Sequence, residues 1–298
     1  MTGQLLIDGV DAYTSFGVYV ERQGWNGLLS FPPLKEPDKN DWQEYDGIEV
    51  DLSDPVLNTR EIQMSLACQG SGYTSFLSAL GGGKAYHIVT ALGRQFKLRL
   101  VQQPSLTMAE ANTLSKLTLK FADDFPLDRS KATYVAPNGS VIWTQGYTLG
   151  NRNLSEYGIT VLSGTEAELR RSGDVKPNLL VNIGSAVGVR YDDNTVRYKS
   201  RDVRLNCLMR SASLTQMWRN LDALLFDLIR PGLRTLNGLD CYYKSMAVSE
   251  FYPEGWPWLK FSLTFCMTGG GIITQRRVYL KHGGTLRLTS DGDMLFIQ

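Results

Sequence analysis

The sequence has few of the side chains that metal and catalytic sites use. Among its 298 residues are two histidines, His87 and His282, and neither has metal-ligand spacing to the other or to a cysteine. The four cysteines lie far apart, three of them within alternating apolar runs, so we expect buried thiols rather than disulfides or zinc ligands. These cysteines are Cys68, Cys207, Cys241 and Cys266. The sequence predicts no metal and no cofactor.

Catalytic motifs are lacking as well. Residues 81–84 (Gly-Gly-Gly-Lys) resemble a phosphate loop, but Ser78 replaces its first glycine and Ala85 stands where the Mg²⁺-binding hydroxyl belongs. There is no Gly-x-Ser-x-Gly nucleophile elbow and no convincing Cys/His pair. The paired acids at residues 123–124, 192–193 and 291–293 are typical of solvated turns. We therefore expect a protein that is not an enzyme.

An excess of charge and a long hydrophobic run are also missing. The chain has 31 Lys and Arg against 30 Asp and Glu, which argues against a protein that coats nucleic acid. The N-terminal residues lack a basic region and reach Asp8 and Asp11 before any long apolar core, so they do not form a secretory signal. Asp222 and Asp227 interrupt the most apolar helical stretch, which excludes a membrane span. We expect a soluble protein made without export.

The chain does contain one pattern twice, at an offset of 141 residues. Residues 16–20 (FGVYV) correspond to residues 157–161 (YGITV), and residues 59–64 (TREIQM) correspond to residues 200–205 (SRDVRL). We expect the repeat-matched positions to share a backbone turn and a contact between domains. They are Gly17 and Gly158, Gly47 and Gly188, and Arg60 and Arg201.

Each half is predicted to be mainly β with one helix. Apolar residues alternate around residues 62–66 and 203–205, which is typical of strands with one buried face. Helical spacing follows from residue 73 to 80 in the first half, before the glycines at residues 81–83. In the second half it runs from residue 214 to 228, with Ser213 and Gln216 spaced as a capping box. Strand hairpins that end at residues 116–121 and 260–265 close the two halves.

These patterns divide the chain into four parts. Residues 1–124 and 150–268 are predicted to be two small β domains, on either side of a linker with a hairpin at residues 125–149. The C-terminal residues 269–298 are predicted to be a β extension that either adds an edge strand or swaps onto a neighbouring subunit. Turn residues at positions 137–139 and 269–271 support these boundaries.

Aromatic residues gather in two polar segments. Aromatics on loops anchor partner proteins or sugars, or they cover the ends of barrels, and the sequence leaves both roles open. A long connection inside a compact domain favours a functional segment. The candidate contact residues are Trp25, Trp42 and Tyr45 in the first segment and Trp256 and Trp258 at a hairpin tip.

Residues 42–66 (WQEYDGIEVDLSDPVLNTREIQMSL) and 242–265 (YYKSMAVSEFYPEGWPWLKFSLTF) resemble the tail-tube fold of long-tailed bacteriophages. In particular they are similar to the N-terminal domain of distal tail proteins. The resemblance implies two tandem, duplicated tail-tube-like domains of the β-barrel or sandwich type, with one helix each. It also implies a distal tail or baseplate hub protein, although a galectin-like domain follows the first domain in the commonest distal tail layout.

The family resemblance further implies a ring that continues the tail tube and attaches tail-tip or receptor-binding components. Its partners would be further copies of the chain, the tail tube protein and tail-tip hub proteins, with DNA passing through the lumen unread. Six chains, or three chains with pseudo-six-fold symmetry, fit such a ring. The protein would be made in the host cytoplasm and reside in the virion. The alternatives are a carbohydrate-binding protein of two β-sandwiches that uses the loop tryptophans, and an enzyme with a carboxylate pair between its domains.

Overall fold

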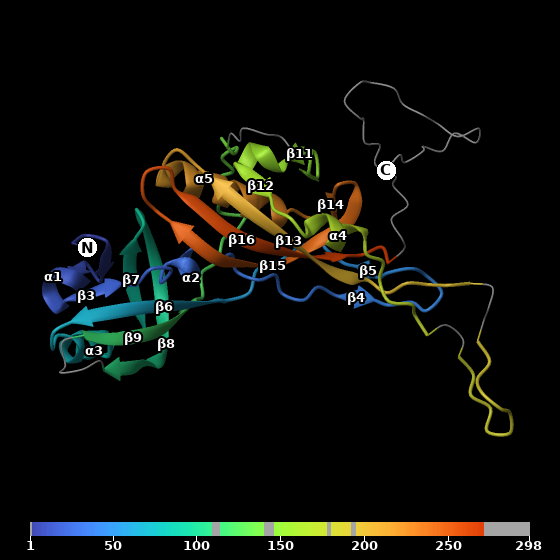
Figure 1. Cartoon of the computed structure of the whole chain (residues 1–298), viewed down its shortest axis with the longest axis horizontal. Helices are drawn as coiled ribbons and strands as arrows, with labels where there is room; N and C mark the ends of the chain where they lie inside the picture. The colour runs from blue at the N-terminus through green and yellow to red at the C-terminus, as the bar shows by residue number, and fades with distance from the viewer. Residues whose placement is uncertain (1, 109–113, 140–145, 178–179, 192–194, 271–298) are drawn as a thin grey trace.

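The structure is a computed structural model that describes residues 2–108, 114–139, 146–177, 180–191 and 195–270. It is mainly β, with two seven-stranded antiparallel sheets placed one after the other along the molecule (Figure 1). We call the sheet of residues 5–123 and its helices the N-terminal unit, and that of residues 148–267 the C-terminal unit. None of the helices in the described part of the chain is long and apolar enough to cross a membrane.

The N-terminal unit has the strand order β2-β1-β7-β8-β9-β6-β3. Its strands are β1 (Leu5–Ile7), β2 (Val10–Asp11), β3 (Val18–Val20), β6 (Arg60–Gln69), β7 (Tyr86–Ala91), β8 (Arg94–Met108) and β9 (Leu114–Asp123). Its helices are α1 (Ala12–Phe16), α2 (Asn26–Leu29) and α3 (Tyr73–Leu80). A separate two-stranded ladder, β4 (Lys39–Asn40) with β5 (Glu49–Val50), lies in the connection between α2 and β6.

The C-terminal unit has the strand order β11-β10-β14-β15-β16-β13-β12, which is the same topology element by element. Its strands are β10 (Thr148–Leu149), β11 (Arg152–Asn153), β12 (Ile159–Val161), β13 (Arg201–Arg210), β14 (Arg234–Leu236), β15 (Leu239–Tyr252) and β16 (Trp258–Met267). Its helices are η2 (Leu154–Tyr157), α4 (Thr165–Arg170) and α5 (Leu214–Leu228). In their described residues, both units therefore carry two short helices besides the expected long one.

The register of the strands repeats together with their order. Val18 pairs with Cys68 in the first sheet and Ile159 pairs with Met209 in the second, at the expected offset. Along β6 and β13 the side chains alternate between buried and exposed, as the spacing of apolar residues predicts. The four cysteines are buried free thiols, which confirms their assignment to the core.

The two long helices end where the sequence predicts. α3 ends at Leu80 before the glycines, and α5 ends at Leu228. The Ser213 side chain accepts a hydrogen bond from the Gln216 backbone N–H, and the Gln216 side chain accepts one from Ala212 N–H. This cap satisfies helix N–H groups that have no partner inside the helix.

The linker lies against α5 and forms no paired strand in its described residues 125–139 and 146–147. Linker residues 140–145 lie outside the described residues, as do residues 271–298 of the expected C-terminal β extension, whereas residues 148–149, expected in the linker, form β10 of the C-terminal unit. An extended linker with backbone groups turned toward a helix is thus the observed arrangement.

Candidate functional site: the joint between the units

Each unit carries one long extended segment between its third and fourth strands, and we call these segments arms. The N-terminal arm is residues 30–59, and the C-terminal arm is residues 171–200, of which 171–177, 180–191 and 195–200 are described. At its base the first arm pairs Leu34 with Leu57, and the second pairs Val175 with Tyr198. All four positions correspond at the offset of the repeat. The two arms therefore leave their sheets in the same way.

The N-terminal arm leaves its own unit and runs along β15 and β16 of the C-terminal unit (Figure 1, blue beneath orange). Leu34 N–H donates to the Lys244 carbonyl at 2.9 Å. Lys244 lies in a bulge of β15, between Tyr243 and Ser245, where the ladder with β16 is interrupted. Because a bulged residue is left unpaired by its own sheet, its carbonyl is free to bind the arm. The Tyr243 hydroxyl donates to the Pro32 carbonyl at 3.0 Å and adds a buried contact.

Apolar side chains seal the arm onto the sheet. Leu52 of the arm is buried in a small cluster with Tyr242 and Cys266 of the C-terminal unit. Partly buried residues of the arm pack against this cluster, which is separate from the main core. They are Leu34, Ile48 and Val50. Burial of apolar area contributes about 25 cal/mol per Å², so this contact stabilises the joint.

The tip of the N-terminal arm approaches the end of β16 very closely. Ile48 N–H donates to the Thr268 carbonyl at 2.9 Å, and Gly47 N–H donates to the Tyr198 carbonyl at 2.7 Å. Gly47 has a φ of 70°, and a Cβ at this position would lie 1.6 Å from the Thr268 oxygen. Glycine is required here both by the left-handed backbone and by the contact.

A buried lysine joins the tip of the first arm to the base of the second. Lys176 is only 1% exposed. Its ammonium donates to the carbonyls of Trp42 and Gly47, both at 2.7 Å, and lies 2.5 Å from an Asp41 carboxylate oxygen. Three oxygen partners compensate for the loss of water around the charge. Sequence reasoning missed Lys176, although Lys35 matches it at the offset of the repeat.

A second contact holds the turn between β7 and β8 against α5. Trp218 Nε1 donates to the Leu92 carbonyl at 2.8 Å, and the Arg94 guanidinium lies 4.3 Å from the Trp218 ring centroid and pairs with Asp222. A cavity of about 670 Å³ lies beside this contact, lined by α5, the turn and the linker. Two unrelated sets of contacts therefore fix one unit against the other.

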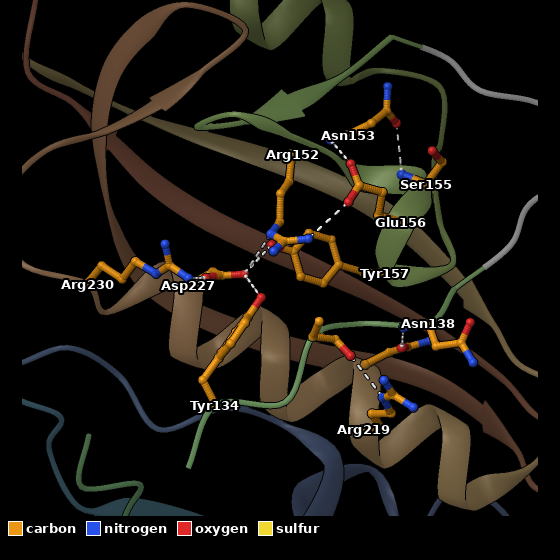
Figure 2. A network of polar contacts seen from close by, with 12 residues as sticks. Tyr134, Asn138, Arg152, Asn153, Ser155, Glu156, Tyr157, Arg219, Asp227 and Arg230 are labelled. Atoms are coloured by element: carbon orange, nitrogen blue, oxygen red, sulfur yellow. Dashed lines mark hydrogen bonds and ion pairs between the residues drawn. The ribbon is translucent and has the colours of Figure 1, made fainter. Parts of the chain in front are cut away.

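The linker is held across α5 by a network centred on Asp227 (Figure 2). The hydroxyls of Tyr157 and Tyr134 donate to the same Asp227 oxygen at 2.6 and 3.1 Å, and the Arg230 guanidinium pairs with its other oxygen. Burial, together with the hydrogen bond to Asp227, raises the pKa of Tyr157, so its hydroxyl remains a donor. Arg152 lies 3.7 Å from Asp227. The acid is thus a structural anchor between linker, η2 and helix.

The predicted aromatic residues lie in separate places. Trp25 belongs to the core of the N-terminal unit and is 9% exposed, so its assignment as a partner contact was wrong. Trp25 is buried because it directly precedes α2, and α2 packs on β6. Trp42 and Tyr45 are exposed at the tip of the N-terminal arm, beside a cavity of about 280 Å³.

The two hairpin tryptophans lie at the turn between β15 and β16. Trp256 is exposed, with the Arg210 guanidinium 5.0 Å from its ring centroid, and Trp258 stacks on Tyr252 at 6.2 Å. Among the described residues, no ring contact joins these tryptophans to Trp42 or Tyr45. The exposed aromatics therefore do not form one binding platform.

The matched glycines have matching backbones. Gly17 and Gly158 follow α1 and η2 with φ values of 69° and 73°, and the αL conformation ends each helix. Gly47 and Gly188 have φ values of 70° and 77°. Gly188 differs in one respect, since a Cβ there would meet no described atom within 4 Å.

The hydrogen bonds and the ion pair of the matched arginines stay inside each unit, which corrects the expectation of a contact between domains. Arg60 donates to the carbonyls of Leu28 and Ser30 and forms an ion pair of 2.7 Å with Asp123. Arg201 donates to the carbonyls of Glu168 and Leu169, both at 2.7 Å. Each arginine satisfies the carbonyl end of the short helix before its arm. The arginines contact their own unit because the short helix packs on the strand that begins with the arginine.

The described residues contain no group of three or more His, Cys, Asp or Glu side chains able to hold a metal ion. His87 is buried, and its Nδ1 lies 3.0 Å from an Asp8 oxygen. The features that stand out are contacts between the two units, and these define the candidate functional site.

Comparison with known proteins includes a structural similarity. No family model matches the chain, and no curated protein matches it. A solved structure of the SPP1 Dit (gp 19.1) protein, called a paradigm of the hub adsorption apparatus in phages that infect Gram-positive bacteria, is 13% identical to this chain. The alignment covers 89% of this chain and 98% of that one, with a TM-score of 0.30. A score of this size does not establish a common fold.

Proposed function

We propose that the protein is a structural component of a bacteriophage tail tip, a distal tail or baseplate hub protein that assembles into a ring continuing the tail tube. One observation carries this proposal. The N-terminal arm docks on the C-terminal unit of its own chain, and the equivalent apolar residues of the C-terminal arm are exposed. A protein made of two such units has the parts for a repeated head-to-tail contact.

Physical reasoning links that observation to a ring. A head-to-tail contact between copies generates a closed ring when its rotation closes, and an open filament when it does not. Exposed edge strands are a hazard for a free monomer. In each described sheet the outermost strands are only two or three residues long, β2 and β3 in one and β11 and β12 in the other. β3 and β12 pair with only three residues each of the ten-residue strands β6 and β13, and assembly into a ring would cover the rest of these edges.

The finer parts of the proposal follow the sequence resemblance. The two units are tail-tube-like domains derived from an internal duplication, and six chains, or three with pseudo-six-fold symmetry, form the ring. It binds the tail tube protein on one side and tail-tip or receptor-binding components on the other. DNA passes through its lumen without sequence readout. The protein is a non-enzymatic part of the virion, made in the host cytoplasm.

Mass measurement and electron microscopy of the purified chain over a concentration series test the proposal. We expect particles of one defined copy number, with a central channel. A monomer at the highest concentration attainable, with no ring in micrographs, would overturn the ring. Binding to a glycan array that is lost in Trp256→Ala would instead favour the carbohydrate-binding alternative.

A further inference from the structure

We infer that the C-terminal arm of one copy docks on the N-terminal unit of a second copy, in the register in which the N-terminal arm docks on the C-terminal unit. The inference deepens the proposed function and rests on it only in requiring that copies associate. Four correspondences between the two halves carry it.

The first correspondence is in the apolar side chains of the arms. Leu34, Ile48 and Val50 pack on the C-terminal unit, as described above. Their counterparts in the other arm are apolar as well, yet they are 50%, 52% and 39% exposed, and they are Val175, Val189 and Tyr191. Three solvent-exposed apolar side chains on one extended segment are typical of an interface that is not yet covered.

The second correspondence is in the receiving strand. Ile62 and Val203 are equivalent, and their partners on the next strand are Phe121 and Phe265. Opposite Phe121 the strand β8 has a bulge between Leu100 and Gln102, and opposite Phe265 the strand β15 has one between Tyr243 and Ser245.

The bulged residue of β8 is therefore Val101, the counterpart of Lys244. The Lys244 carbonyl accepts from Leu34 of the arm, whereas the Val101 side chain is 48% exposed. In the proposed contact the Val101 carbonyl accepts from Val175 N–H of the second copy. A bulge leaves one residue without a ladder partner, so this acceptor is available.

The third correspondence is a lysine at the base of each arm. Lys176 is buried against Trp42 O, Gly47 O and Asp41, whereas its counterpart Lys35 is exposed. The matching positions in the C-terminal arm again offer two carbonyls and a side-chain oxygen, from Ile183, Gly188 and Asn182. Lys35 of the second copy is the donor for these three acceptors.

The fourth correspondence is the replacement of an ion pair by a pair of apolar residues at equivalent positions. Arg197 lies 3.9 Å from Asp46 where the first arm meets the base of the second. The counterpart of Arg197 is Val56 and that of Asp46 is Val187, and both valines are exposed. An ion pair in the contact within the chain is thus matched by two apolar residues in the contact between copies. Each pair is complementary, and mixed pairs would place a charge against a methyl group.

Gly188 and the shape of the molecule agree with this arrangement. Gly188 keeps the backbone that lets Gly47 approach a carbonyl, and its own surroundings are open. The C-terminal arm extends beyond the end of the molecule opposite the N-terminal unit (Figure 1). A second copy that accepts this arm would therefore follow head to tail, which is a heterologous contact.

Cross-linking of cysteine variants tests the contact. Val56→Cys chains are mixed with Val187→Cys chains and treated with a short bismaleimide. The native thiols do not compete, because all four are buried and burial raises the pKa of Cys207 and Cys241 to about 12. We expect covalent dimers in the mixture and none from either chain alone. The matched control is the double variant Asp46→Cys with Arg197→Cys, which should link within one chain.

The outcomes separate this inference from the proposed function. Rings in micrographs, with no dimers from the mixture while the control links, would overturn the arm contact and leave the ring standing. Absence of any association would overturn both. A second measurement uses Lys35→Met, which should weaken association about tenfold or more in sedimentation, since it removes the ammonium that would bind these three acceptors. Lys39→Met, at an exposed residue of the same arm that pairs with Glu36, should leave association unchanged.

Discussion

The N-terminal arm and the C-terminal arm begin with equivalent strand pairings, Leu34 with Leu57 and Val175 with Tyr198. The two arms differ in the surface that lies beside them. Leu34 and Ile48 rest on a sheet of the other unit, whereas Val175 and Val189 are half exposed. The side chains at these positions are apolar in both arms. Burial is therefore set by the neighbouring surface, and the exposed arm marks where such a surface is missing from a single chain.

The arginines at the start of β6 and β13 differ in a similar way. Both hold the end of a short helix, but Arg60 also pairs with Asp123, whose counterpart at the end of β16 is Met267. One unit thus has a nearly buried ion pair where the other has a methionine. The following variants test these differences in dilute, monomeric protein.

The largest effect is expected for the arginines. Arg60→Met leaves the Asp123 carboxylate without its partner, which should lower the free energy of unfolding by about 3–5 kcal/mol. Arg201→Met removes hydrogen bonds to two carbonyls and should cost about 1–3 kcal/mol. Urea unfolding measures both. Equal losses would contradict the role given to Asp123.

The second largest difference in stability is expected between variants of the two lysines at the arm bases. Lys176→Met removes the buried ammonium that donates to the Trp42 and Gly47 carbonyls and pairs with Asp41, and it should lower the free energy of unfolding by about 3 kcal/mol. Lys35→Met should change it by less than about 0.5 kcal/mol, because Lys35 is exposed in a single chain. Thermal unfolding of the two variants, side by side, measures the contrast.

The glycines at the arm tips sharpen the comparison further. Alanine at either position strains a left-handed backbone and should cost about 1 kcal/mol. Gly47→Ala also forces the arm away from Thr268 and should cost about 2 kcal/mol or more. The difference between the stability losses of Gly47→Ala and Gly188→Ala, measured by urea unfolding, gives the contribution of the close approach of Gly47 to Thr268. If the two losses are equal, that approach does not contribute to stability.

The smallest effect concerns the long helices. Ser213 caps α5 with its side chain, whereas Gly72 precedes α3 with no side chain to offer. Ser213→Ala should lower the free energy of unfolding by about 1 kcal/mol, and Ser213→Asn should restore most of it. Circular dichroism during thermal unfolding measures the loss, and a loss in Ser213→Asn as large as in Ser213→Ala would contradict the cap.

Much of the fold was predictable from local patterns. Alternating apolar residues marked β6 and β13, helical spacing marked α3 and α5, and the repeat marked which elements correspond. These features depend on residues close in the chain. The candidate site was less predictable. The polar neighbours of Trp25 leave a partner contact open, although its side chain is buried, and a lone lysine such as Lys176 carries no local signal of burial.

By itself the sequence determined that the chain has two β units related by an offset of 141 residues, which lengthens to 144 in the closing strands. It also determined glycines at left-handed turns, apolar faces on the strands and thiols in the core. These properties follow from the periodicity of strands and helices and from the steric freedom of glycine. Only the tertiary structure decided that the N-terminal arm is covered by the C-terminal unit, that Lys176 is buried and that Lys35 is exposed. Those outcomes depend on contacts between residues about one unit apart in the chain, and such contacts leave no local pattern to read.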